Sequence, residues 1–204
     1  MKSASIAYRT AILEEPDSTP LLVYVKAAEA YIDLEEYDLA ILSYQDAIER
    51  LQKEHEGLKE SKPQVGASLA FPPEWRIRLA QLLKAAERQC EASDRHGDDH
   101  AGSLDCHEYQ LMIAIKSIDA LRMLMPPSPR MYALRAVANS ERGRSLQARS
   151  DALKAVRYYN AKYPNATPLG TNQSTEAIMR AVLGNDHLLF RPIVTPIASP
   201  TPTM

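Results

Sequence analysis

One set of four residues recurs along this chain at multiples of 36 positions, and it constrains the fold more than any other feature. The first two sets, 36 positions apart, are Ala4, Tyr8, Ala11, Ile12 and Ala40, Tyr44, Ala47, Ile48. A third set lies 108 positions beyond the second: Ala148, Ala152, Ala155, Val156. Steps of four, three and one place all four side chains on one face of a helix. Self-similarity at this period is typical of a helical repeat array.

Helix-breaking residues divide the chain into eight expected helices. They cover residues 3–14, 21–34, 37–60, 73–92, 104–125, 130–142, 145–162 and 174–183. Proline-containing stretches separate several of them, and only 7 glycines are present in the whole chain, which favours helix over sheet. We therefore predict an all-α fold built from antiparallel helix pairs, with 174–183 covering the exposed end of the stack.

Residues 21–54 resemble a tetratricopeptide repeat (TPR). The matching positions are Tyr24, Ala28, Tyr31, Tyr37, Ala40, Tyr44 and Ala47. Small residues let the paired helices approach, and the tyrosines fill the gaps between neighbouring pairs. Residues 1–16 are similar to the second helix of a preceding unit, and 129–163 match more weakly. The resemblance implies a short TPR-like right-handed solenoid over 1–185. A helix stack outside this family, and a three-helix microtubule-interacting-and-transport domain over 21–60, stay open as alternatives.

The end of the chain differs in composition from the rest. The last fourteen residues contain four prolines. We expect residues 186–204 to form a separate tail that is extended or disordered. Four apolar residues give it a means of docking on the helices: Leu188, Leu189, Phe190 and Ile193.

The family resemblance implies binding of a peptide or partner protein in a groove lined by the first helix of each pair. The expected partner-binding residues are Val25, Glu29, Asp33, Arg130, Ala133 and Val137. Some family members clamp a C-terminal carboxylate with Lys, Asn and Arg, but here Glu29 stands where such a clamp needs Asn. We therefore expect a scaffold or adaptor that does not use that clamp.

Signatures of catalysis are absent from the sequence. It contains no Gly-rich phosphate loop, nucleophile elbow or His-Glu-x-x-His helix. We predict a protein that is not an enzyme, with no catalytic residues and no cofactor.

The net charge of −2 hides two segments of opposite charge. Residues 1–62 hold 7 Lys/Arg and 13 Asp/Glu, and residues 129–163 hold 8 Lys/Arg and 2 Asp/Glu. This polarity fits binding of a charged partner or head-to-tail self-association, and it also fits two solvated helix faces. Nucleic-acid binding by 129–163 is an alternative function, which we disfavour because the acidic half would repel phosphates.

Both cysteines and three of the five histidines lie in residues 90–107. Cys90, His96, His100 and Cys106 are donors of the kind that zinc prefers. Their spacing is not that of established zinc modules, so we predict no metal and keep a zinc-stapled loop as the alternative.

No stretch approaches the roughly 20 apolar residues of a membrane helix, and the N-terminus lacks the apolar core of a secretory signal. We expect a cytoplasmic protein that does not bind membranes.

Overall fold

The computed structural model describes residues 2–14, 18–59, 73–85 and 107–193, and within these ranges all regular structure is helical. The helices are α1 (Lys2–Glu14), α2 (Leu21–Ile32), α3 (Tyr37–Lys59), α5 (Pro73–Ala85), α6 (His107–Leu124), α7 (Pro129–Glu141), α8 (Ser145–Lys162) and α9 (Thr175–Leu183), followed by the 3₁₀ helix η1 (Leu188–Phe190). The prediction of an all-α fold is confirmed. Each of the eight predicted helices has a counterpart in the structure.

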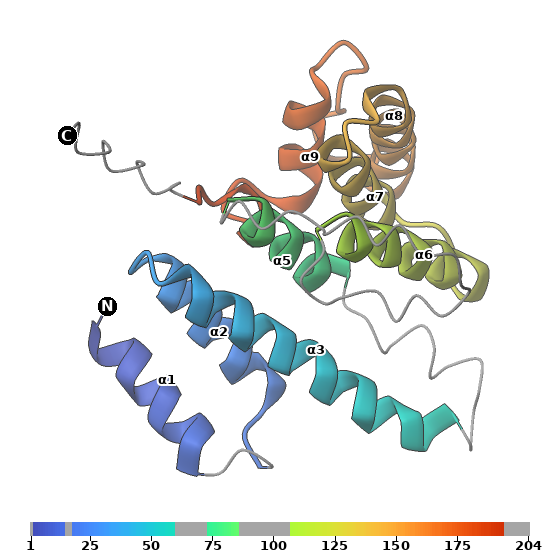
Figure 1. Ribbon diagram of the computed structural model, residues 1–204. Helices are drawn as coiled ribbons and strands as arrows, with labels where there is room; N and C mark the ends of the chain where they lie inside the picture. Colours follow the sequence, from blue (N-terminus) through green and yellow to red (C-terminus); the bar gives the residue numbers. More distant parts are fainter. Residues whose placement is uncertain (1, 15–17, 60–72, 86–106, 194–204) are drawn as a thin grey trace, which may run out of the picture.

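Consecutive helices pack against each other in chain order (Figure 1). The most extensive contacts join α2 to α3, α5 to α6, and α7 to α8. Smaller contacts join one pair to the next, from α3 to α5 and from α6 to α7, while α9 packs on both α7 and α8. The described chain is thus a stack of adjacent helix pairs with α1 at one end and α9 at the other.

The turns of the first and last pairs have the same backbone geometry. A left-handed residue lies in both turns shortly after the helix, with φ of 61° at Glu35 and 71° at Gly143. The next amide, that of Glu36 or of Arg144, donates to the carbonyl five residues earlier, at 2.9 and 2.8 Å. This is the hydrogen bond of a Schellman motif. Equivalent residues lie 108 positions apart, so the repeat that the sequence shows extends to the turns.

The repeated side chains fill the core in two of the three sets. The buried residues are Ala40, Tyr44, Ala47, Ile48, Ala148, Ala152, Ala155 and Val156. In the first set, Tyr8 and Ile12 are only half-buried, because α1 lies at the end of the stack and packs mainly on α2.

Helix α5 contributes to two core clusters. Leu79, Leu82 and Leu83 pack with α2 and α3 in the first cluster. Ile77 and Ala80 belong to a second cluster formed with α6, α7, α8, α9 and η1. In Figure 1, α5 accordingly lies between the blue N-terminal helices and the yellow and orange C-terminal ones. This helix is where the two halves of the stack meet.

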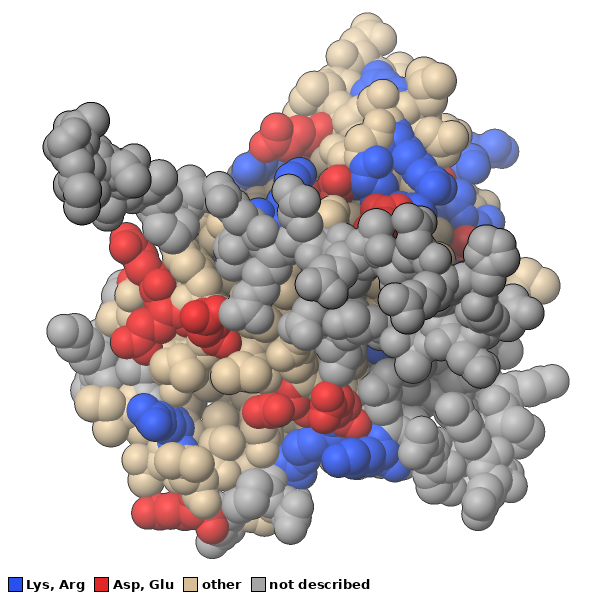
Figure 2. Space-filling view, viewed as in Figure 1, with Lys and Arg blue, Asp and Glu red and all other residues tan. Residues whose placement is uncertain are grey.

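Charged side chains are unevenly distributed over the surface in Figure 2. Lys and Arg gather over the end of the molecule that contains α8, and acidic side chains cluster over the α2–α3 end. Several arginines of the basic range 129–163 form ion pairs with acidic side chains of the same chain. Arg135 forms two 2.9 Å contacts with buried Asp151, and Arg142 pairs with Glu108. In the described part of the chain, no helix has the length and apolarity needed to cross a membrane.

Candidate functional site

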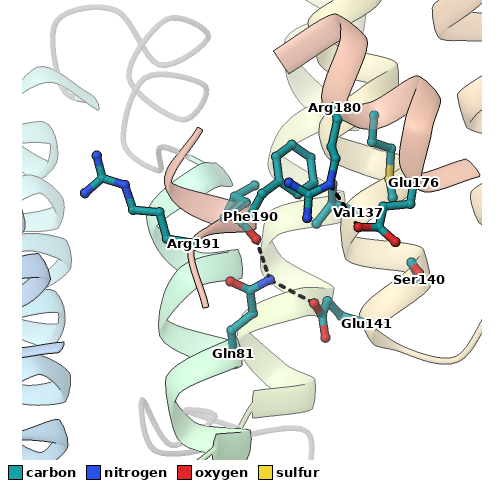
Figure 3. A pocket seen from close by; sticks show the side chains of 10 residues that line it. Gln81, Val137, Ser140, Glu141, Glu176, Arg180, Phe190 and Arg191 are labelled. Atoms are coloured by element: carbon teal, nitrogen blue, oxygen red, sulfur yellow. Dashed lines mark hydrogen bonds and ion pairs between the residues drawn. The ribbon is translucent and has the colours of Figure 1, made fainter. Parts of the chain in front are cut away.

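A hollow of about 270 Å³ opens between α5, α7, α9 and the chain that follows α9 (Figure 3). Its lining is mixed polar and apolar: Gln81, Val137, Ser140, Glu141, Glu176, Met179, Arg180, Leu189, Phe190 and Arg191. A second hollow of about 370 Å³ shares Gln81, Glu141 and Arg191 with it. The two adjoin along α5, and residues 189–193 form part of their walls. The surface of α5, α7 and α9 on which both the hollows and these residues lie is called the groove below.

The C-terminal segment, residues 187–193, lies along this groove. Gly184, with φ of 102°, ends α9 and lets the chain turn away from the helix. After η1, Arg191 has extended φ and ψ of −69° and 131°. Leu189 is buried in the second core cluster, and Ile193 packs against the first. The segment therefore runs across α5 from one cluster to the other.

Two side chains of α5 bind the main chain of this segment. Arg78 Nη1 donates to the carbonyl oxygen of Arg191 at 2.9 Å. Gln81 Nε2 donates to the carbonyl oxygen of Leu189 at 3.2 Å. Arg78 and Gln81 are three residues apart, so they project from the same face of the helix. Contacts to carbonyl oxygens recognise the path of a backbone, whatever its side chains are.

A carboxylate on α2 completes this part of the site. Glu29 lies 3.1 Å from Arg78 Nε and 3.8 Å from Arg191 Nη1. It also accepts a 2.6 Å hydrogen bond from the hydroxyl of Tyr44 on α3. Burial first, and the neighbouring Glu29 second, raise the pKa of Tyr44 well above its usual value. The hydroxyl is thus held protonated as a donor, and Glu29 accepts from two buried donors while facing Arg191.

On the α9 side, the groove holds the aromatic ring of the segment. The guanidinium of Arg180 lies over the ring of Phe190, 4.6 Å from its centroid, and bonds to Glu176 at 2.9 Å. A guanidinium over an aromatic face is attracted by the ring quadrupole. Glu141 accepts a 2.8 Å bond from Gln81, and so orients the amide that binds the main chain. Figure 3 shows Gln81 between Glu141 and the segment.

His187 begins the segment beside charged residues of α5 and α7. Arg130 Nη2 lies 3.3 Å from His187 Nε2 and pairs with Glu74 at 2.8 Å. The amide of Leu189 lies 3.4 Å from His187 Nδ1. Burial, followed by the charge of Arg130, lowers the pKa of His187, and Glu74 opposes this effect. A neutral ring keeps one acceptor nitrogen for these donors, and an imidazolium keeps none.

The structure brings three of the six predicted partner-binding residues to this region: Glu29, Arg130 and Val137. Asp33 is exposed at the end of α2, away from the contacts described above. Val25 and Ala133 are buried in core clusters, at 5% and 0% exposure. Both were expected to contact a partner in a groove. In the structure they pack against neighbouring helices of this chain.

Sequence reasoning missed Arg78, Gln81 and Glu141, which make the main polar contacts of the groove. The available signal was weak, because Arg78 and Gln81 are spaced by three on a helix that also carries Glu74, Arg76 and Lys84. From the sequence, the tail was expected to lie outside the folded unit, at 186–204. In the structure, residues 188–193 pack on the helices. The docking of Leu188, Leu189, Phe190 and Ile193 agrees with the apolar pattern noted there.

The alternative zinc loop lies almost wholly outside the described residues. Cys90, His96, His100 and Cys106 fall in the range 86–106, and His107 begins α6. Among the residues that the structure does describe, no cluster of three His, Cys, Asp or Glu has metal-binding geometry.

Comparisons of this chain with protein-family models, curated proteins and solved structures found no match.

Proposed function

We propose that this protein is a non-enzymatic interaction module that binds an extended peptide of a partner protein along the groove. The observation that carries this function is the segment itself. Residues 187–193 lie across α5, bound through two carbonyl oxygens, an ion pair and four apolar side chains. A surface that holds the backbone and side chains of one short segment in this way can hold those of another.

We also propose that the helix pairs form a TPR-like right-handed solenoid whose inner face contains the groove. The equivalent turns at Glu35 and Gly143 support this reading, because they repeat at three times 36 residues. The groove is lined by α5, α7 and α9, and Glu29 of α2 reaches it. In this reading these helices are the first members of successive pairs, which line the inner face of such a solenoid.

The polar contacts support a protein ligand over a nucleic acid. The cations that line the groove are already paired with carboxylates: Arg78 and Arg191 with Glu29, Lys84 with Glu141, and Arg180 with Glu176. They are therefore not free to neutralise phosphates. Four arginines of the basic range 129–163 already have partners in this chain. Arg130, Arg135 and Arg142 pair with carboxylates, and Arg149 bonds to a carbonyl oxygen.

The test is affinity purification from native extract with the full chain and a Glu141→Lys variant. Glu141 is partly exposed in the groove, so charge reversal changes the groove without opening the core. The matched control is Arg157→Glu, a charge reversal on the exposed face of α8.

We expect a stoichiometric protein partner with the wild type and the control, and its loss with Glu141→Lys. If the partner is retained by Glu141→Lys and lost with Arg157→Glu, the binding surface lies on α8 and not in the groove. Recovery of nucleic acid in place of protein would contradict the proposal.

A further inference from the structure

The C-terminal segment has one core residue, Leu189, and beyond it contacts like those of a bound peptide. Arg191 is 54% exposed at its side chain, yet its carbonyl oxygen and its guanidinium both have partners on other helices. These partners are Arg78 on α5 and Glu29 on α2, more than 100 residues earlier in the chain. The bonds lie in the groove, where a partner's peptide would bind.

Three of the four residues from 190 to 193 contact different kinds of surface, and the fourth is an exposed proline. Phe190 lies against Arg180, and Arg191 faces Glu29. Pro192 has no amide hydrogen and favours an extended backbone in the residue before it. Ile193 packs against the first core cluster. The groove thus discriminates by side chain at three positions and by backbone at two carbonyl oxygens.

We infer that the groove recognises peptides in which an aromatic residue is followed by a basic residue, a proline and an aliphatic residue. We further infer that residues 190–193, Phe-Arg-Pro-Ile, occupy the groove in cis and compete with the partner's peptide. This inference rests on the proposed function. It adds the chemical class of the ligand and a means of regulation, because a partner must displace the segment in order to bind.

Tethering determines the size of the effect. A segment joined to its groove by a short linker has an effective concentration on the order of 1 mM, so it blocks the groove whenever its intrinsic Kd is about 10–100 µM. Releasing the segment then lowers the apparent Kd for a competing peptide by about 10- to 100-fold.

The experiment measures fluorescence anisotropy of a labelled peptide with the sequence of residues 186–193 during titration with the full chain. Three forms are compared: wild type, Arg191→Glu and the control Arg157→Glu. Arg191→Glu places a carboxylate against Glu29 and weakens cis docking, while the exposed side chain leaves the core intact. A second probe carries Arg191→Glu in the peptide, which tests the basic position without altering the protein.

We expect the Arg191→Glu protein to bind the first probe about 5- to 10-fold more tightly than the wild type, because the substitution weakens cis docking about tenfold and does not abolish it. The Arg157→Glu protein should match the wild type, and the second probe should bind at least about tenfold more weakly to every form. Equal affinity of the wild type and Arg191→Glu for the first probe would overturn competition in cis. Equal affinity for the two probes would overturn the basic preference.

Two outcomes separate this inference from the function on which it rests. If neither probe binds any form while the partner is still lost with Glu141→Lys, the inference fails and the proposed function stands. If sedimentation shows a wild-type dimer that Arg191→Glu dissociates, the segment belongs to the groove of a second copy, and occupation in cis is overturned.

Discussion

The Oε1 atom of Glu29 lies 3.1 Å from Nε of Arg78 and so links α2 to α5, the helix shared by the two core clusters. The Arg78 side chain is 1% exposed, and that of Glu29 is 15% exposed. Removing either charge strongly destabilises the folded state, because the other charge is then buried without a partner.

We predict that Arg78→Met lowers the free energy of unfolding by about 3 kcal/mol, because Glu29 is left without its buried counter-ion. Urea denaturation followed by circular dichroism measures the change. Arg157→Met removes an exposed arginine from α8 and should alter stability by less than about 0.5 kcal/mol. Similar losses in the two variants would show that the buried pair has no special role.

We predict that Tyr44→Phe costs about 1 kcal/mol at pH 7, the value of one hydrogen bond. The substitution should also reduce the loss of stability in alkali. The pKa of Tyr44 is higher in the folded state than in the unfolded state. Its contribution is therefore complete below pH 10, the unfolded value, and is lost as pH rises toward the folded value. Denaturation curves from pH 8 to 11 test this, and parallel pH profiles of the two proteins would refute it.

The two equivalent turns predict opposite effects of substitution. Glu35→Gly should stabilise the protein by about 1 kcal/mol, because a left-handed backbone is strained for any residue with a Cβ. Gly143→Ala should destabilise it by about 1 kcal/mol for the same reason, although no atom within 4 Å obstructs the added Cβ. Gly170→Ala is the control, since its added Cβ is equally unobstructed and its φ is not left-handed. The midpoint of thermal unfolding reports all three.

Acidification should release the C-terminal segment. The pKa of His187 is lowered in the docked state, so the neutral ring is favoured there. Docking is then strongest above the undocked value of about 6.5 and is lost as pH falls through the docked value. Hydrogen exchange of the amides in 188–191, corrected for the intrinsic pH dependence of the rate, should show less protection at pH 5.5 than at pH 7.5. His187→Gln should remove the difference, and an unchanged difference would assign it to other groups.

Local periodicity accounts for what the sequence predicted well. The repeated alanines at 40, 47, 148 and 155 are buried where paired helices meet, because their spacing alone places them on one face. The helix expected at 174–183 corresponds to α9, Thr175–Leu183, and Ser174 caps it by accepting from the amide of Ala177.

Contacts between distant residues were not visible in the same way. Glu35 and Gly143 occupy the same turn position. Only the glycine indicates a left-handed residue in the sequence. The four prolines near the end of the chain gave no sign that Arg78, which lies 113 residues before Arg191, binds its carbonyl oxygen. Burial of Val25 and Ala133 likewise depends on neighbours that only the fold supplies.

The path of residues 187–193 changes how this stack is connected. In a helical array each unit touches only its neighbours, so the contacts form an open line and the ends can unravel separately. Here the chain that leaves the last helix returns to α5 and α2. The contacts of the last part of the stack thus reach back to its first helix pair, and the segment cannot leave the stack without breaking bonds to both α5 and α2.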